Sequence, residues 1–196
     1  MRFPHRLRRE LMSPRWYLWG LAGLLVGGII HILIVLSVPT QVPFNIFDKV
    51  ARFGPDRQFH MLPPVLPRTE PLVDLDPAMR HAICRYQLDE GPILVRAEVS
   101  SPFWSVALFN REGQTIYSLN DRTADKGEIS MLVITQQQLA ILRENPPADL
   151  EEMIIIETEE VDGFALLRAF VPSAAYEPQV LDGLERAECT SRINQI

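Results

Sequence analysis

Cys84 and Cys189, the only cysteines of this chain, are the residues whose type most directly suggests chemistry. Three possibilities are open: a structural disulfide, a reactive pair, or two separate buried thiols. Cys84 belongs to the alternating segment HAICRYQL, where it shares one side with Ala82 and Tyr86. We therefore expect it on the apolar face of a strand, where cysteines are inert. A catalytic thiol needs a nearby histidine base, and His81 falls on the opposite face.

The most concentrated polar stretch is SLNDRTADKGE, residues 118–128. Asn120, Asp121 and Arg122 directly follow a predicted strand that carries Tyr117, and binding residues often lie in loops at strand ends. A pocket near these four residues is therefore one hypothesis for a ligand or substrate site. The other interpretation is a turn, in which the Asn and Asp side chains bond to their own backbone and Arg122 pairs locally.

Common catalytic and nucleotide-binding motifs are missing from the sequence: it has no HExxH, CxxC, GxSxG, Walker loop or GxGxxG. His60 and His81 lack the spacing of metal ligands, so we predict neither a metal nor a cofactor. From Pro39 onward the chain has 14 basic and 24 acidic residues, a net charge of about −10. Nucleic-acid binding is therefore disfavoured, because phosphate neutralisation needs a basic surface.

An apolar segment, WYLWGLAGLLVGGIIHILIVLSV, precedes all of these residues. It covers residues 16–38, 23 residues without formal charge. At about 1.5 Å rise per residue a helix of this length reaches roughly 34 Å, enough to cross a hydrocarbon core of about 30 Å. Trp16, Tyr17 and Trp19 gather at its start, where aromatic rings favour the headgroup level. A cleaved signal peptide is the other interpretation, but its apolar region is normally about 7–15 residues long.

The charge of the N-terminal tail predicts the orientation of this span. Residues 1–15 contain five arginines and one acidic residue, and a positive flank stays in the cytoplasm. We therefore expect a single-pass membrane protein, with the N-terminus in the cytoplasm, residues 16–38 in the lipid bilayer and residues 39–196 on the outer side. Gly23 and Gly27 form a GxxxG motif that permits a homodimer of the span, although this motif is common by chance in Gly-rich spans.

Residues 39–75 contain seven prolines and predict a packed, mostly extended connector with one short helix at NIFDKVARF. Residues 76–196 predict a β-rich domain of about seven strands in sequential hairpins, including HAICRYQL with PILVRAEV and EMIIIET with FALLRAFV. Helices are expected after the capping pair Thr135 and Gln138, and near Pro178 with Cys189 at the end. The fold class is mainly β with peripheral helices, an antiparallel β-sandwich or partly open barrel, preceded by one transmembrane helix.

The segment CRYQLDEGPILVRAEVSSPFWSVALFNREGQTIYSLNDR resembles the core of an uncharacterised bacterial family, domain-of-unknown-function family twelve fifty-four. The matching positions are Gly91-Pro92, Phe103-Trp104-Ser105 and Asn120-Asp121-Arg122. The resemblance covers roughly residues 40–190 and implies an exported or inner-membrane protein. Short members of that family carry one N-terminal span and often a cysteine near the C-terminus. The resemblance implies no established activity.

Two functions from different classes fit these observations. The first is a non-catalytic interaction or assembly subunit of an envelope complex, with a membrane or periplasmic protein as its partner. The second is a periplasmic enzyme or small-ligand-binding domain with a pocket near Tyr117, Asn120 and Arg122.

The compartment also decides between the possibilities for the two cysteines. A periplasmic location predicts a disulfide between Cys84 and Cys189, whereas an inverted topology would favour two separate thiols. The closed loop of about 105 residues gives an upper estimate of about 4.7 kcal/mol for the stabilisation in the chain-entropy model.

Overall fold

The computed structural model describes residues 14–41, 46–124, 127–144, 146–147 and 150–192. The chain divides into two compact units, Met1–Phe44 and Asn45–Ile196. Residues 1–13, which carry most of the basic tail expected from the sequence, lie outside the described residues.

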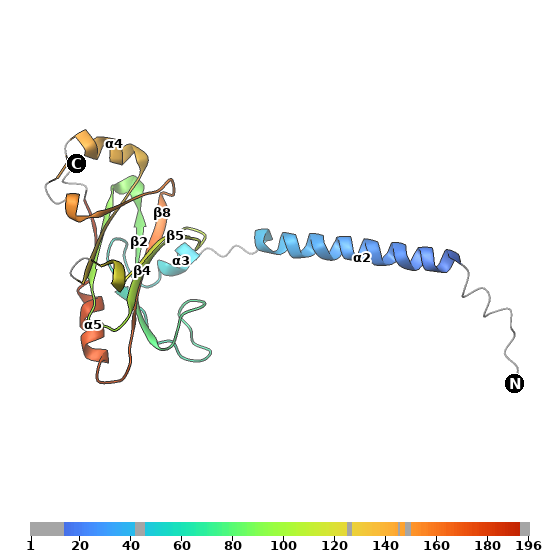
Figure 1. Cartoon of the computed structure of the whole chain (residues 1–196), viewed down its shortest axis with the longest axis horizontal. Helices are drawn as coiled ribbons and strands as arrows, with labels where there is room; N and C mark the ends of the chain where they lie inside the picture. Colours follow the sequence, from blue (N-terminus) through green and yellow to red (C-terminus); the bar gives the residue numbers. More distant parts are fainter. Residues whose placement is uncertain (1–13, 42–45, 125–126, 145, 148–149, 193–196) are drawn as a thin grey trace, which may run out of the picture. The chain divides into compact units, whose positions relative to one another are not determined.

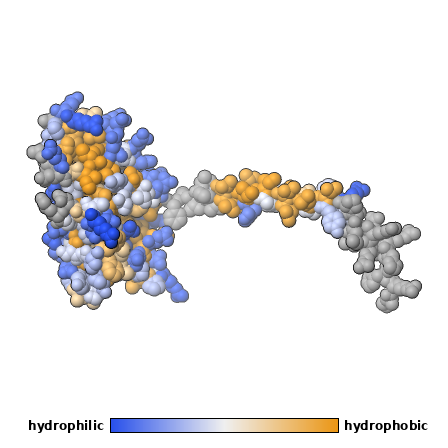
Figure 2. Space-filling model, in the orientation of Figure 1, coloured by the Kyte–Doolittle hydropathy of each residue, from blue (hydrophilic) through white to orange (hydrophobic). Residues whose placement is uncertain are grey.

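The first unit contains the helix α2 (Pro14–Gln41). Its stretch Arg15–Ser37 has 23 residues, is long and apolar enough to cross a membrane, and is 0% buried. Figure 2 shows hydrophobic residues along the length of α2. The expectation of one apolar N-terminal helix of spanning length is confirmed.

The second unit contains two β-sheets, parts of which are labelled in Figure 1. The first sheet has the strand order β1-β2-β8-β4-β5, and the second has the order β7-β6-β3-β9. The strands of the first sheet are β1 (His60–Met61), β2 (Met79–Gln87), β8 (Asp162–Phe170), β4 (Trp104–Asn110) and β5 (Thr115–Asn120). Those of the second are β7 (Ile154–Glu157), β6 (Glu128–Ile134), β3 (Ile93–Glu98) and β9 (Glu188–Ser191).

One apolar core lies between the two sheets. Alternate residues of both sheets fill it, among them Tyr86 and Leu108 from the first sheet and Val95 and Met131 from the second, all buried. Period-two alternation places these side chains on the inner faces. The mainly β fold with a few helices is therefore confirmed as a sandwich of two sheets, and the described strands do not close into a barrel.

Smaller apolar clusters cover the outer faces, by which we mean the sides turned away from the opposite sheet. The segment that begins with α3 (Ile46–Val50) packs Val50, Leu62 and Leu72 against Ile83 and Phe164 of the first sheet.

Two longer helices add to the packing. The helix α4 (Gln136–Glu144) packs Leu139 and Leu142 against the second sheet, and α5 (Glu177–Glu185) buries Val180 and Leu184 in the central core. Short 3-10 turns are η1 (Leu88–Glu90), η2 (Asp121–Thr123) and η3 (Leu150–Glu152).

The helix starts expected from the sequence are present. The Thr135 N–H donates to Gln138 Oε1 at 3.0 Å, and the Gln138 N–H donates to Thr135 Oγ1 at 3.4 Å. This reciprocal pair satisfies backbone donors that the first turn of α4 leaves free. Pro178 lies in the first turn of α5, where its missing N–H removes no helical bond.

The expectation of sequential hairpins is wrong for both hairpins that the sequence predicts by name, and β3 and β4, like β5 and β6, also lie in different sheets. β2 and β3 belong to different sheets, and so do β7 and β8, so their short connections carry the chain across the sandwich. The β4–β5 hairpin is present, with Gly113 at a φ of +85° in its turn. Pairing is antiparallel except between β6 and β7. Cys189 lies in β9 rather than at a helix end, and this short strand is not predicted from the sequence.

Candidate functional site

The structure joins Cys84 of β2 to Cys189 of β9 in a disulfide, with Cα atoms 6.5 Å apart. The exposed fractions of the two residues are 0% and 2%, so the bond lies in the core between the two sheets. Thiol exchange needs access to an attacking thiolate. The pair is therefore the structural bridge among the three possibilities, and it links sheet to sheet rather than strand to helix.

The polar loop that the sequence singled out is a capped turn. The Asn120 side-chain oxygen accepts from the Arg122 N–H at 3.1 Å, and the Thr123 hydroxyl donates to the Asn120 carbonyl at 2.7 Å. These bonds use the Asn120 oxygen to start η2. Arg122 is exposed, and Tyr117 is 39% exposed. One carboxylate oxygen of Asp121 is buried without a hydrogen-bond partner among the described residues.

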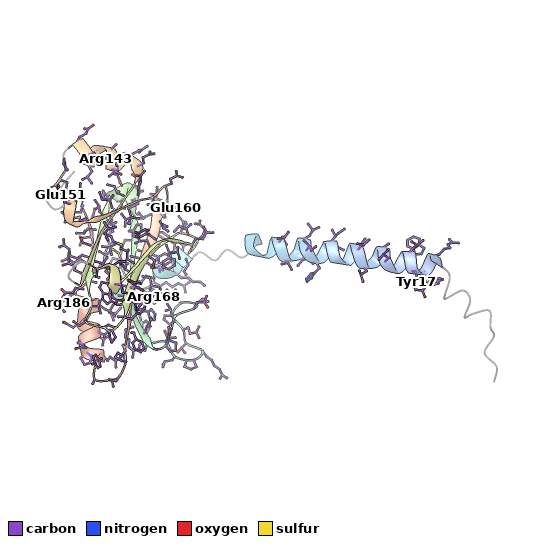
Figure 3. All side chains as sticks on the ribbon, in the orientation of Figure 1. Tyr17, Arg143, Glu151, Glu160, Arg168 and Arg186 are labelled. Carbon is purple, nitrogen blue, oxygen red and sulfur yellow. A yellow bond between two sulfur atoms is a disulfide. The ribbon has the colours of Figure 1, made fainter. Side chains whose placement is uncertain are left out.

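Two hollows of the sandwich are lined by other residues. One, of about 130 Å³, lies over the outer face of the second sheet, where Arg96 pairs with Glu128 at 2.8 Å. Arg186, labelled in Figure 3, also lines it. The other is small and apolar, and its lining includes Leu132, Leu142 and Leu150. Figure 2 shows hydrophobic surface near α4. Tyr117, Asn120 and Arg122 line neither hollow.

The first sheet brings Asn120 into register with three polar residues of other strands. His81 of β2 pairs with Arg168 of β8, Arg168 pairs with Ser105 of β4, and Ser105 pairs with Asn120 of β5. Paired residues of antiparallel strands project from the same face. The residues next to these four in the sequence, such as Ala169, lie in the core. Because side chains alternate along a strand, the four residues themselves form a polar row on the outer face of the first sheet.

The polar row contains one exposed charge between buried neutral groups. Arg168 Nε donates to Ser105 Oγ at 2.7 Å, and Figure 3 labels Arg168 on the sandwich. Ser105 is 2% exposed and His81 is 3% exposed. Burial, followed by the charge of Arg168, lowers the pKa of His81 to about 4, although Asp76 opposes the shift. His81 is therefore neutral at pH 7.

This geometry favours binding over acid–base catalysis. Two ladder steps of about 4.8 Å place the backbones of His81 and Ser105 about 10 Å apart, with Arg168 between them. A nucleophile and its base need hydrogen-bond contact, and a base is most effective with a pKa near the working pH. Arg168 forms no ion pair within the described part of the chain, so its guanidinium can hold a carboxylate or phosphate.

The sequence indicates Asn120 as a candidate binding residue, but it does not indicate Arg168, Ser105 or the position of His81 in this row. Arg168 lies in an apolar strand segment, FALLRAFV, and Ser105 in FWSVALFN. No spacing in the sequence joins them, because the four residues come from four strands. A charged residue within an otherwise apolar strand was the one available signal.

Comparisons with known proteins show a shared fold. No family model and no curated protein matches this chain. The VPA0106 protein from Vibrio parahaemolyticus aligns with a TM-score of 0.55 and 11% identity, over 76% of this chain and 35% of that protein. An uncharacterised protein from Burkholderia cenocepacia gives 0.46 and 10% identity, over 78% of this chain and 42% of its own. The chain therefore spans less than half the length of both proteins, and the first likeness supports the fold alone.

Proposed function

We propose that this chain is a membrane-anchored exported protein whose β-sandwich is a non-catalytic interaction or assembly subunit of an envelope complex. The observation that carries the proposal is an unburied apolar helix of spanning length in the same chain as a core disulfide. Disulfides persist in oxidising compartments such as the periplasm. The arginines before the helix support a cytoplasmic N-terminus and a periplasmic sandwich in the bacterial inner membrane.

The polar row supports the non-catalytic half of this proposal. Arg168 separates Ser105 from His81, and the low pKa of His81 makes it a weak base near neutral pH. The acidic balance after Pro39 disfavours nucleic acid and leaves proteins as the expected partners. The resemblance to domain-of-unknown-function family twelve fifty-four supports export and adds no activity.

A small-ligand-binding domain is the second candidate. Arg168 favours it, because its guanidinium donates to Ser105 but forms no ion pair among the described residues. The ligand would be a small anion, because the guanidinium of Arg168 is the charged group of the polar row. The Asn120 oxygen would not contact it, since that oxygen is engaged in the η2 cap. Titration calorimetry of the full chain with small carboxylates and phosphates is expected to give saturable heat that Arg168→Gln abolishes. Binding that survives Arg168→Gln contradicts a site at this row.

Topology is the test of the leading proposal. A reporter enzyme active only in the periplasm is expected to be active after Ile196 and inactive before Arg15. A fluorescent protein that matures only in the cytoplasm is the control and should show the reverse pattern. Reporter activity before Arg15 alone, or a mature chain that begins near Thr40, contradicts the anchored topology.

Purification of the full chain in mild detergent then tests the interaction half of the proposal. A protein that co-purifies in a fixed ratio supports the interaction role, and the identity of that protein indicates the envelope process in which the complex takes part. A chain that is monomeric, without a partner, and that turns over a small substrate supports the second candidate instead.

A further inference from the structure

Arg168 differs from the other arginines that lie within described strands. Three of the four strand arginines form an ion pair with an acidic side chain. These pairs are Arg80–Glu177, Arg85–Asp56 and Arg96–Glu128. The fourth, Arg168 of β8, is exposed and forms no ion pair among the described residues. Its positive charge is therefore available to a carboxylate from outside the chain.

The guanidinium of Arg168 is held in place by the neighbouring strand. β4 and β8, both labelled in Figure 1, pair with each other, and this register sets Ser105 beside Arg168. Arg168 Nε donates to Ser105 Oγ at 2.7 Å, and Ser105 is 2% exposed. The two terminal nitrogens, Nη1 and Nη2, form no hydrogen bond with a described residue. A guanidinium oriented in this way can hold a carboxylate through two parallel hydrogen bonds.

Two phenylalanines lie beside Arg168 on the outer face of the first sheet. Side chains two positions apart along a strand project from the same side, so Phe170 shares the face of Arg168, and Phe103 shares that of Ser105. The Phe170 N–H donates to the Phe103 carbonyl at 2.9 Å, which makes the two residues neighbours. Phe103 is 36% exposed, and neither ring joins an apolar cluster of the described residues. Arginine and aromatic side chains together are typical of the centres of protein interfaces.

We propose that the Arg168 face, made by Arg168, Ser105, Phe103 and Phe170, is the surface on which another exported protein docks. The partner contributes an aspartate or glutamate side chain flanked by apolar residues. Its carboxylate accepts from Nη1 and Nη2 of Arg168, and its apolar neighbours cover the two phenylalanine rings. From Pro39 onward the chain has 14 basic and 24 acidic residues, so most of its surface repels an acidic segment. The guanidinium therefore fixes where such a segment binds.

This inference rests on the proposed function as an interaction subunit, and it names the docking face and the chemistry of the partner. It differs from a site for a small anion because the phenylalanine rings take part in binding. The two failures are distinguishable by purification of the variant Arg168→Glu. A protein that co-purifies with this variant as well as with the wild type keeps the proposed function and overturns the Arg168 face.

Peptide binding to the full chain in detergent tests the chemistry of the partner. The probe is the capped tripeptide leucine–aspartate–leucine. The same tripeptide with asparagine lacks the charge, and acetate has the carboxylate without apolar neighbours. In titration calorimetry we expect the aspartate peptide to bind about ten-fold more tightly than either control. No saturable binding of the aspartate peptide overturns the inference. Equal affinity for acetate also overturns it and favours a small-anion site.

Variants of the face separate the two contributions. Arg168→Glu is expected to weaken binding of the aspartate peptide at least about ten-fold, whereas Arg143→Glu makes the same change in charge on α4 and should leave it unchanged. Phe103→Ala keeps the bond between Arg168 and Ser105, so it tests the face even where Arg168→Glu fails to fold. We expect it to weaken the aspartate peptide about five-fold and to leave acetate unchanged. An aspartate peptide that binds Phe103→Ala as tightly as the wild type contradicts docking on this face.

Photo-cross-linking in cells then tests the face with the natural partner. Benzoylphenylalanine in place of Phe103 in the full chain is expected to cross-link one protein, and the same residue in place of Ile141 is the control. Ile141 is 54% exposed on α4, which packs against the second sheet. Arg168→Glu should remove the cross-link, and an arginine in place of the partner's acidic residue should restore it. Equal cross-linking from both positions, a cross-link that survives Arg168→Glu, or a cross-linked segment without an acidic residue overturns the inference.

Discussion

His81 is a buried imidazole whose protonation opposes folding. Its pKa falls from 6.5 to about 4 in the folded chain, first because of burial and then because of the nearby charge of Arg168. A group whose pKa is lower in the folded state binds more protons after unfolding, so stability rises with pH between the two values. The contribution of His81 is therefore lost as the pH falls from about 6.5 toward about 4, and is constant above about pH 7.

The variant His81→Gln is expected to flatten this part of the pH profile. The free energy of unfolding of the wild type should fall by up to about 3 kcal/mol more than that of the variant between pH 7 and pH 4. Denaturant unfolding of the full chain in detergent at several pH values measures it. His60→Gln changes a partly exposed histidine and serves as the control. Parallel profiles for wild type and His81→Gln would show that His81 is not held neutral.

Among the elements, the end of β5 depends on Asn120 rather than on Arg122. Asn120→Ala removes the oxygen that accepts the Arg122 N–H and is expected to lower the free energy of unfolding by about 1 kcal/mol. Arg122→Ala keeps that backbone bond and removes only an exposed side chain, so its effect should stay below about 0.5 kcal/mol. Chemical denaturation of the two variants side by side gives the comparison. A loss of several kcal/mol for Arg122→Ala would make Arg122 a structural residue and remove it from any binding hypothesis.

For the whole molecule, the disulfide ties the first sheet to the second. Cys84→Ala with Cys189→Ala is expected to lower the free energy of unfolding by about 2–5 kcal/mol, because the unfolded chain regains the freedom of a long loop. Thermal unfolding of the double variant against the wild type measures the loss.

Thiol labelling tests the same bond directly. The denatured, non-reduced wild type should take up no label, and the reduced protein should take up two labels per chain. Two labels without reduction would refute the bridge, and a dimer on a non-reducing gel would assign it to two different chains.

The sequence by itself determined the local features of this protein. The apolar length of α2, the alternation in β2 and β3, the Thr135–Gln138 cap and the start of α5 near Pro178 all depend on residues within a few positions of one another. The sequence also predicts the disulfide once an oxidising compartment is assumed, because two cysteines allow only one intramolecular pairing.

Only the tertiary structure decided which strands are neighbours. Alternation says which side of a strand is apolar, but β2 meets β8 and β3 meets β6 because two sheets must bury their inner faces against each other. The polar row has the same origin, since the register of four strands aligns His81, Arg168, Ser105 and Asn120. β9 is too short and too polar to show a pattern, and its pairing with β3 is what positions Cys189 against Cys84. The free energy of burying side chains between the sheets comes from contacts between residues far apart in the sequence. No short segment of the sequence therefore predicts which strands pair.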